Sequence, residues 1–246
     1  MNIEESLYSL IDNKFGNHPF SYGVTKENIE NLLANYLAMS QAFPYIQAGS
    51  QANLILTVMK NNIDVPIEIE MTSVVGNFLS WDETGGHHII VENGVKGLPL
   101  ILNTQMNFHA NYLKKDIFLL LGKNLSPSYS SITQKYLKNL LSGFASITHL
   151  ERLAYMVAFE QHAGIMIESL WKSLSTQFLI DKDDLFYFRI HVGGSDPAEP
   201  YHIEITRSMI KKFIKNRTES ESFINYFTEA YSNNFNWCES IKIQAN

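Results

Sequence analysis

Hydrophobic residues along this chain recur mostly at intervals of three and four, which is the spacing of one face of an α-helix. Ile29, Leu32, Leu33 and Tyr36 give the clearest example. The chain shows no alternation of strand and helix patterns, no repeat period and no low-complexity tract. The pattern therefore predicts an all-α chain.

Turn and capping residues divide this pattern into segments. Pro44 is expected to break or kink the second segment, because proline removes a helix hydrogen bond. The residues after Tyr231 are polar and are expected to form a tail outside the core. The expected helices span residues 1–13, 25–40, 45–61, 66–81, 104–121, 126–142, 148–178, 181–191, 197–215 and 219–231.

Residues 81–103 differ from the rest, because four glycines and a proline interrupt them. We expect a long loop here, with one strand-like piece at 87–91 and at most one short strand pair near residues 87–101. Loops of this length inside compact domains are usually functional or disordered.

Composition and length fit one globular domain. The chain has 246 residues, of which 45% are hydrophobic and 18% are charged. That is enough apolar material for a sizeable core. We expect a single-domain helical bundle over residues 1–246, with its core at about 25–232. Its helix content should be above about 60%, well over the usual third.

Charge and motif content exclude several classes of function. The net charge of −6 argues against a nucleic-acid binder, and we expect the pairs Lys114-Lys115 and Lys211-Lys212 to be solvated. The chain lacks Gly-rich phosphate loops, which argues against a nucleotide cofactor. It lacks an apolar run of about 18 residues, which argues against a membrane protein. One cysteine, Cys238, excludes an internal disulfide and a multi-cysteine metal site. With no secretory signal at the N-terminus, we expect a cytoplasmic protein.

The densest group of potential metal ligands lies in residues 186–202. His191, Glu199 and His202 are offset by eight and eleven positions, which returns all three to nearly one face of a helix. Histidine and carboxylate side chains are the ligands that iron sites use in helical bundles. This stretch is the first candidate for a metal site.

The same stretch also has the pattern of a helix start. Gly193-Gly194 should interrupt any helix, after which Ser195 or Asp196 serves as N-cap with Pro197 in the first turn. In that interpretation Asp196 and Glu199 only bind backbone N–H groups. Ligands from elsewhere in the chain must decide between the two interpretations.

Three residues outside this stretch are candidate partners. Glu160 lies in the apolar middle of the longest predicted helix, where a carboxylate is costly unless it is paired or bound to metal. The alternative is that Glu160 faces solvent or pairs with a lysine. Glu83 lies at a helix end and His109 early in the next helix. The alternatives are a surface acid and an ordinary core or surface histidine.

Other histidines are weaker candidates. His87 and His88 compete with His109 but lie in the expected loop, where geometry is less fixed. His162 lies two positions after Glu160, roughly 200° around the helix, so it should not share a site with Glu160.

Four motifs in order resemble one family. They are Glu83-Thr-Gly85; His109 through Leu113 to Leu121-Gly122; Ala154 to Glu160; and Phe188-Arg-Ile-His191 with Glu199-Pro-Tyr-His202. Together they resemble the haem-oxygenase-like helical superfamily over residues 25–215. The branch in question is that of the di-iron oxidases that include the chlamydial death-domain-associated protein. Thiaminase-II (TenA) and pyrroloquinoline-quinone synthase are more distant relatives.

The resemblance implies a haem-oxygenase-like bundle and a homodimer. It implies two irons per chain, no haem, and activation of O₂ on a small organic substrate. Glu160 would bridge the irons, and Asp196 is a substitute for Glu199. The implied metal ligands are Glu83, His109, Glu160, His191, Glu199 and His202. The implied substrate pocket consists of Trp81, Tyr155, Phe159, Phe186 and Tyr201.

The chain departs from the family pattern in three places. The Glu83–His109 interval is long, and residues 193–196 extend the last motif. Phe159 stands where some relatives carry a phenol, so a reaction on the protein's own tyrosine is not supported. Two alternatives remain. One is a metal-free binding or interaction protein of the same fold. The other is a cofactorless hydrolase or oxidase that uses carboxylates as acid and base, of which the hydrolase is disfavoured by the position of Cys238. If the site exists, the ends of Glu160, His191 and His202 should lie within about 8 Å of one another around one cavity.

Overall fold

The computed structural model describes residues 3–22, 24–196 and 198–243. These residues form eleven α-helices and three short 3-10 helices, and none of them is in a strand. The α-helices are α1 (Ile3–Lys14), α2 (Ile29–Asn61), α3 (Ile67–Glu83), α4 (Gly86–Asn93), α5 (Thr104–Asn107), α6 (His109–Leu121), α7 (Ser131–Phe144), α8 (His149–Phe178), α9 (Phe186–Val192), α10 (Glu199–Phe213) and α11 (Arg217–Ile243). The 3-10 helices are η1 (Pro19–Ser21), η2 (Gly94–Leu102) and η3 (Lys182–Asp184). The prediction of an all-helical single domain is confirmed.

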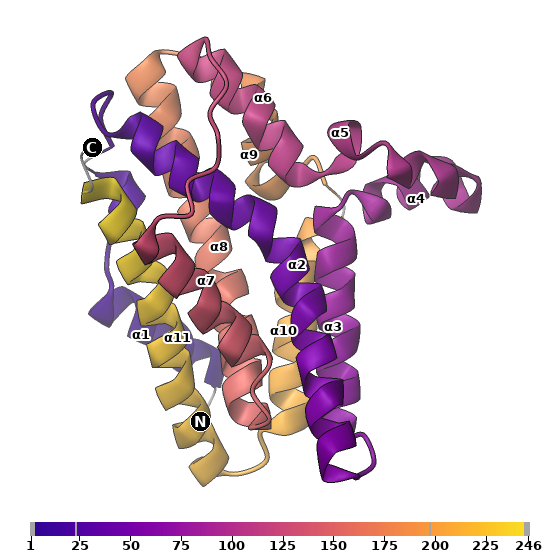
Figure 1. Ribbon diagram of the computed structural model, residues 1–246. Coiled ribbons are helices and arrows are strands. Elements are labelled where there is room, and N and C mark those ends of the chain that lie inside the picture. The colour runs from indigo at the N-terminus through magenta and orange to yellow at the C-terminus, as the bar shows by residue number, and fades with distance from the viewer. Residues whose placement is uncertain (1–2, 23, 197, 244–246) are drawn as a thin grey trace.

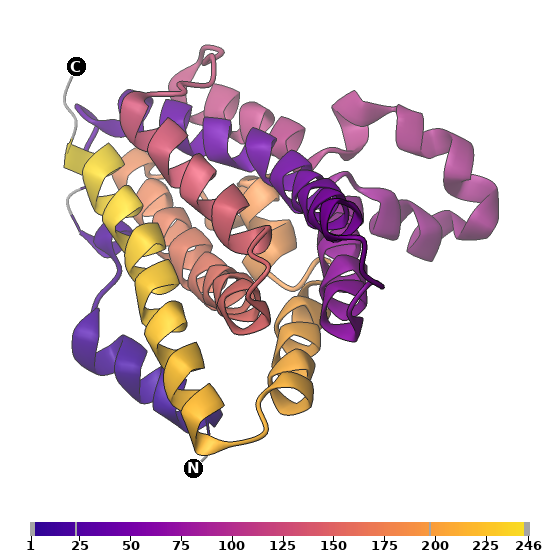
Figure 2. The same cartoon turned by 60° about the horizontal axis from the view of Figure 1, so that its bottom comes forward.

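The long helix α8 is the centre of the bundle. It packs against α11, α10, α9 and α7, while α2 crosses beside α7 and lies against α3 (Figures 1 and 2). Every residue from 152 to 162 is buried. A helix that is enclosed on all sides buries any polar side chain it carries on either face.

Helix α2 continues through Pro44, contrary to the expected break. The chain is helical from Ile29 to Asn61 with the proline inside it. Ser80 Oγ on α3 donates to the carbonyl of Pro44 (2.9 Å), which ties this turn of α2 to α3. Tertiary packing against α3 and α7 therefore outweighs the local cost of the proline.

The C-terminal residues are not a polar tail. Helix α11 extends to Ile243, and Trp237, Cys238 and Ile241 are at most 2% exposed. The stretch packs along α8. The apolar positions of this stretch lie on one buried face of α11, although serine and asparagine residues separate them in the sequence.

The expected loop at 81–103 is helical. Residues 86–102 form α4 and η2, which project from the bundle as an arm (Figure 1). Its glycines shape packing rather than a loop. Gly85 adopts a left-handed φ of 79° at the N-cap of α4, and a Cβ on Gly86 would collide with the Trp81 ring. No strand pair forms at 87–101.

Several helix boundaries differ from the expected ones. The predicted helix 104–121 divides at Phe108, whose extended backbone (φ −65°, ψ 128°) makes His109 the first residue of α6. The next helix begins at Ser131 rather than 126, where Ser130 Oγ accepts from Thr133 N (3.3 Å). Pro197 lies outside the described residues, and α10 begins at Glu199.

None of the helices within the described residues is long and apolar enough to cross a membrane.

Candidate metal centre

Glu83, His109 and His191 form the first of two polar clusters in the bundle. Glu83 ends α3, His109 starts α6, and His191 lies in the last turn of α9. His109 Nδ1 lies 3.2 Å from His191 Nε2. Each of these nitrogens is 3.5 Å from a Glu83 carboxylate oxygen. Three separate helix ends thus bring one carboxylate and two imidazoles together.

The tautomer of His191 is fixed by its own helix. His191 Nδ1 donates to the backbone carbonyl of Tyr187, one turn earlier (2.7 Å). Its Nε2 therefore faces Glu83 and His109. Burial lowers the pKa of His191, but the hydrogen bond and charge of Glu83 outweigh burial and raise this pKa to about 9. For Glu83, burial raises the pKa, but the hydrogen bonds and charges of His109 and His191 outweigh burial and bring this pKa well below its usual range.

The second cluster surrounds His202 on α10. His202 Nδ1 lies 3.5 Å from Glu160 Oε2 and 3.7 Å from Glu199 Oε2. On the other side of the ring, Nε2 donates to Asp82 Oδ2 (2.8 Å). The Asp82 bond fixes the tautomer, so Nδ1 faces the two glutamates. Such a carboxylate behind a histidine is the usual support of a metal-binding imidazole.

The pKa values of His202 and Glu199 are shifted because both side chains are buried among several acids. Burial lowers the pKa of His202, but hydrogen bonds to Asp82 and Glu160 outweigh it and raise this pKa to about 12. Burial raises the pKa of Glu199 to about 7, against the lowering effect of His191 and His202. Within the described chain, Glu199 Oε2 is buried without a hydrogen-bond partner. A buried oxygen of this kind is costly unless a proton or cation meets it.

Both clusters face one small cavity. Its volume is about 30 Å³, and its lining includes Glu83 and His191 from the first cluster and Glu160, Glu199 and His202 from the second. The expectation that His191 and His202 face one cavity together with Glu160 is confirmed. Two ligands of one metal at about 2.1 Å are about 3.0–3.4 Å apart in octahedral or tetrahedral geometry. The separations of 3.2–3.5 Å in the first cluster are within about 0.1 Å of that range.

Comparison with known proteins bears on the fold. No family model matches the chain, and no curated protein matches its sequence. The crystal structure of a CADD-like protein of unknown function from Nostoc punctiforme PCC 73102 superposes with a TM-score of 0.69 and 14% identity. The match covers 99% of this chain and 96% of that one. The chain has a CADD-like fold. The predicted resemblance is thereby confirmed for the fold, and at this identity the likeness carries no activity with it.

All six implied ligands lie in the two clusters of this CADD-like fold, but Asp196 has a different role. Asp196 Oδ1 accepts from the backbone N–H of Ala198 (2.8 Å), so it closes the turn that leads into α10. Glu199 instead turns toward His202. The two sequence interpretations of this stretch therefore each describe one of the two acids.

Of the five residues implied to form the substrate pocket, only Phe159 lines this cavity. Phe159 lines the cavity and stacks on Phe43 at 4.2 Å. Trp81 and Tyr201, which are 36% and 58% exposed, do not line it. Tyr155 packs on Gly143 and Phe186 on Tyr112. Tyr201 precedes His202 by one position and Trp81 precedes Glu83 by two, which places their side chains about 100° and 200° around the helix from those residues, away from the cavity.

Asp82 and Tyr187 are parts of the site that the sequence did not reveal. Tyr187 lies one turn before His191 and lines the cavity, so helical spacing is a signal for it. Asp82 precedes Glu83 and gave no separate signal. His87 Nδ1 lies 3.8 Å from Asp82 Oδ1, outside the two clusters, and His88 pairs with the exposed Glu92.

His162 belongs to a third buried group with His18 and Cys238, on the other side of α8. The expectation that it does not share the site of Glu160 agrees with this placement. His18 Nε2 lies 3.2 Å from His162 Nε2. Phe20 N donates to His18 Nδ1 (3.1 Å), so the proton of His18 is on Nε2 and is directed at His162.

Proposed function

We propose that the protein is a non-haem di-iron oxidase or oxygenase that activates O₂ on a small organic substrate. The observation that carries this proposal is the pairing of two carboxylate–histidine clusters across one buried cavity. Carboxylate and imidazole ligands that project inward from facing helices are the usual di-iron set in bundles. The CADD-like fold supports the proposal as an analogy only.

The residues present offer ligands for two metal ions: the ligand atoms of the first cluster all lie within 4.8 Å of one another, and His202 Nδ1 has Glu160 and Glu199 oxygens at 3.5 and 3.7 Å. Glu83, His109 and His191 would hold one ion; Glu160, Glu199 and His202 would hold the other. Bound iron would supply O₂ binding and activation. The tautomers are already set, because Tyr187 O and Asp82 Oδ2 accept the outer protons of His191 and His202. The inner nitrogens must release a proton when metal binds, so uptake should acidify the solution.

Apolar side chains form the part of the cavity wall that carries no candidate ligands. Met39, Phe43 and Phe159 line it, and all three are at most 6% exposed. An apolar wall limits access of bulk water to the reacting atoms. The cavity of about 30 Å³ admits a water-sized molecule and no organic substrate.

The test is iron binding by protein purified without metal and loaded with Fe²⁺ under anaerobic conditions. We expect one to two irons per chain, and each of Glu160→Ala and His202→Ala should abolish one site, since loss of a ligand removes most of the binding energy. Oxygen should be consumed only by loaded protein. Glu168→Ala on α8 and His88→Ala on α4 are matched controls, because their partners are the exposed Lys172 and Glu92.

Equal iron uptake by wild type and both ligand variants would reject the proposal. The metal-free binding protein of the same fold would then be the better description.

A further inference from the structure

A solvent-accessible groove lies beside the buried cavity. Its volume is about 690 Å³, within the range of about 300–1,000 Å³ that small-molecule sites occupy. Ser40 and Glu83 line both the groove and the cavity. The two spaces therefore meet at these side chains, and a molecule in the groove lies next to a ligand of the first cluster.

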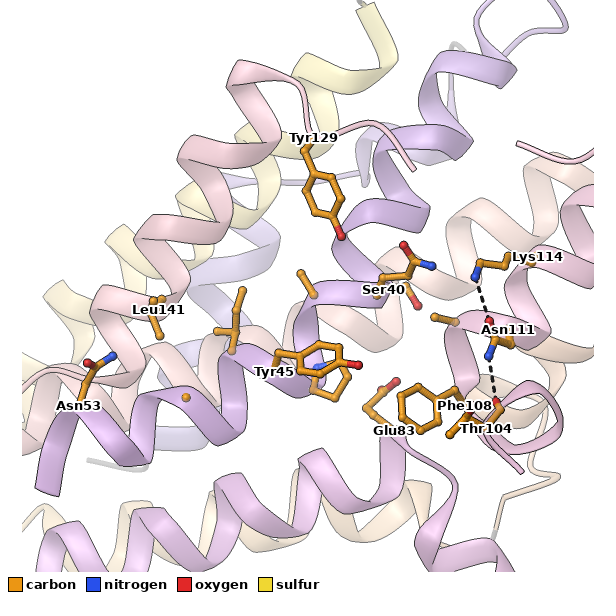
Figure 3. A pocket seen from close by; sticks show the side chains of 16 residues that line it. Ser40, Tyr45, Asn53, Glu83, Thr104, Phe108, Asn111, Lys114, Tyr129 and Leu141 are labelled. Atoms are coloured by element: carbon orange, nitrogen blue, oxygen red, sulfur yellow. Dashed lines mark hydrogen bonds between the residues drawn. The ribbon is translucent and has the colours of Figure 1, made fainter. Parts of the chain in front are cut away.

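The groove has one lysine and one glutamate among otherwise uncharged lining residues. Glu83 is engaged by His109 and His191. Lys114 is half-buried; its ammonium donates to Asn111 Oδ1 (3.0 Å) and forms no salt bridge within the described residues. Asn111 Nδ2 in turn donates to Thr104 O (2.8 Å). Figure 3 shows Lys114, Asn111 and Thr104 on one side of the pocket, with Glu83 beside Phe108.

Lys114 differs in this respect from its neighbour. Lys115 is exposed and lies over the Tyr112 ring, outside the groove lining. The sequence predicted a solvated pair, which describes Lys115 but not Lys114. A half-buried cation that an amide holds in place, with no carboxylate to balance it, is complementary to an anionic group on a ligand.

We infer that Lys114 anchors the carboxylate of a small organic acid whose apolar end extends toward Glu83. This inference rests on the proposed function for the reaction, but the binding site does not depend on metal. His109 and Lys114 are five positions apart on α6, about 7.5 Å along the axis. A chain of about six bonds spans that distance. The substrate class is therefore a small organic acid long enough to reach from Lys114 to Glu83 along the groove.

The test uses three probes of one shape: para-fluorophenylbutyrate, the corresponding amine and the corresponding alcohol. Binding to metal-free full-length protein is measured by fluorine NMR. We expect the acid to bind about tenfold more tightly than the alcohol, and the amine more weakly than both, because a partly exposed charged hydrogen bond contributes about that factor. Lys114→Gln should remove the preference and Lys114→Arg should keep it. Lys115→Gln is the matched control, and circular dichroism verifies that each variant is folded.

The orientation is tested with Co²⁺ as a paramagnetic probe in the metal centre. Fluorine at the far end of the ring should broaden more than fluorine beside the carboxylate in an isomeric probe. The reverse result means that the acid binds the metal directly and overturns the inference. So does a failure of the acid to bind, or an unchanged preference in Lys114→Gln. If the protein takes up no metal while the Lys114-dependent preference remains, the proposed function fails and the anion site stands.

Discussion

Two buried histidine clusters lie on opposite faces of α8, only two residues apart along the helix. Glu160 points toward His202, and His162 points toward His18. Glu160, His202, His18 and His162 are at most 6% exposed. The groups Asp82–Glu199–His202 and His18–His162–Cys238 each bring potential ligand atoms within 4.8 Å of one another. Geometry alone does not separate them.

The two clusters differ in their carboxylates and in which ring nitrogen of each histidine carries the proton. In the candidate metal centre, the outer nitrogens of His191 and His202 donate to oxygens, and the inner nitrogens face carboxylates. In the His18 pair the outer nitrogen accepts from Phe20 N, so the inner N–H already satisfies His162. A metal between those two rings would need His18 to lose its only proton. Closely packed histidines therefore indicate a metal site only where their outer hydrogen-bond partners are acceptors.

The largest expected contrast is in metal binding. His191→Ala should weaken binding at the first cluster by more than about 100-fold, because loss of a ligand exceeds the 10–100-fold effect of losing a supporting residue. His162→Ala should leave iron stoichiometry unchanged. Iron analysis after equilibrium dialysis measures both.

The control variant has its own expected effect. His162→Ala leaves a cavity and an unpaired His18, so the free energy of unfolding should fall by about 2–4 kcal/mol in denaturant titrations. Loss of iron by His162→Ala with little change in stability would contradict the comparison.

The second contrast is in the pH dependence of metal-free protein. Burial lowers the pKa of His18 to about 3 and that of His162 well below its usual value. The unfolded chain then binds more protons below its own histidine pKa of about 6.5, so stability falls as the pH falls. For His18 the loss is about 2 kcal/mol by about pH 5.

The metal centre should respond with the opposite sign. The pKa of His191 is raised to about 9, so its contribution is complete below about pH 6.5 and is lost as the pH rises toward 9. Denaturant titrations at acidic, neutral and alkaline pH measure both arms. His162→Gln should make the acid arm shallower, and a bound metal should reduce the alkaline arm. A single monotonic trend that both changes leave unaltered would contradict this assignment.

The smallest expected effect concerns Asp82. Asp82→Asn keeps an acceptor for His202 Nε2–H but removes the charge that makes the imidazole a stronger ligand, so affinity at the second cluster should fall about tenfold. Asp64→Asn is the control, because Asp64 is an exposed acid in the connection between α2 and α3. Competition with a chelator gives both affinities. Equal affinities in the two variants would remove Asp82 from the site.

The ligands were predictable because helical spacing survives in the sequence wherever one face of a helix is buried. Glu160 stands out inside an apolar run, and His191 and His202 return to one face. Asp82 was not predictable, because only the packing of α10 against α3 decides which of two adjacent acids meets His202. The roles of Asp196 and Glu199 were left open for the same reason. Local patterns fit both roles, and tertiary contacts assigned one to each residue.

The fold was predicted less well where glycines and small polar residues dominate. Glycine marks both loops and close helix packing, and Gly86 beside Trp81 is a case of the second. Phe108 gave no sign that its backbone would divide a helix, yet that division makes His109 the first residue of α6. The end of α11 carried an apolar spacing at Trp237, Cys238 and Ile241 that intervening polar residues obscured.

Glu83 has a consequence for regulation, since its carboxylate is a wall of the open groove and a member of the buried cluster at once. Two ligands that share one side chain are thermodynamically linked. If metal at the cluster changes the affinity of the groove for an organic acid by some factor, the acid changes the affinity for metal by the same factor. A cell rich in that acid would then hold more of the protein in its metal-loaded form, or less, according to the sign of that one coupling energy.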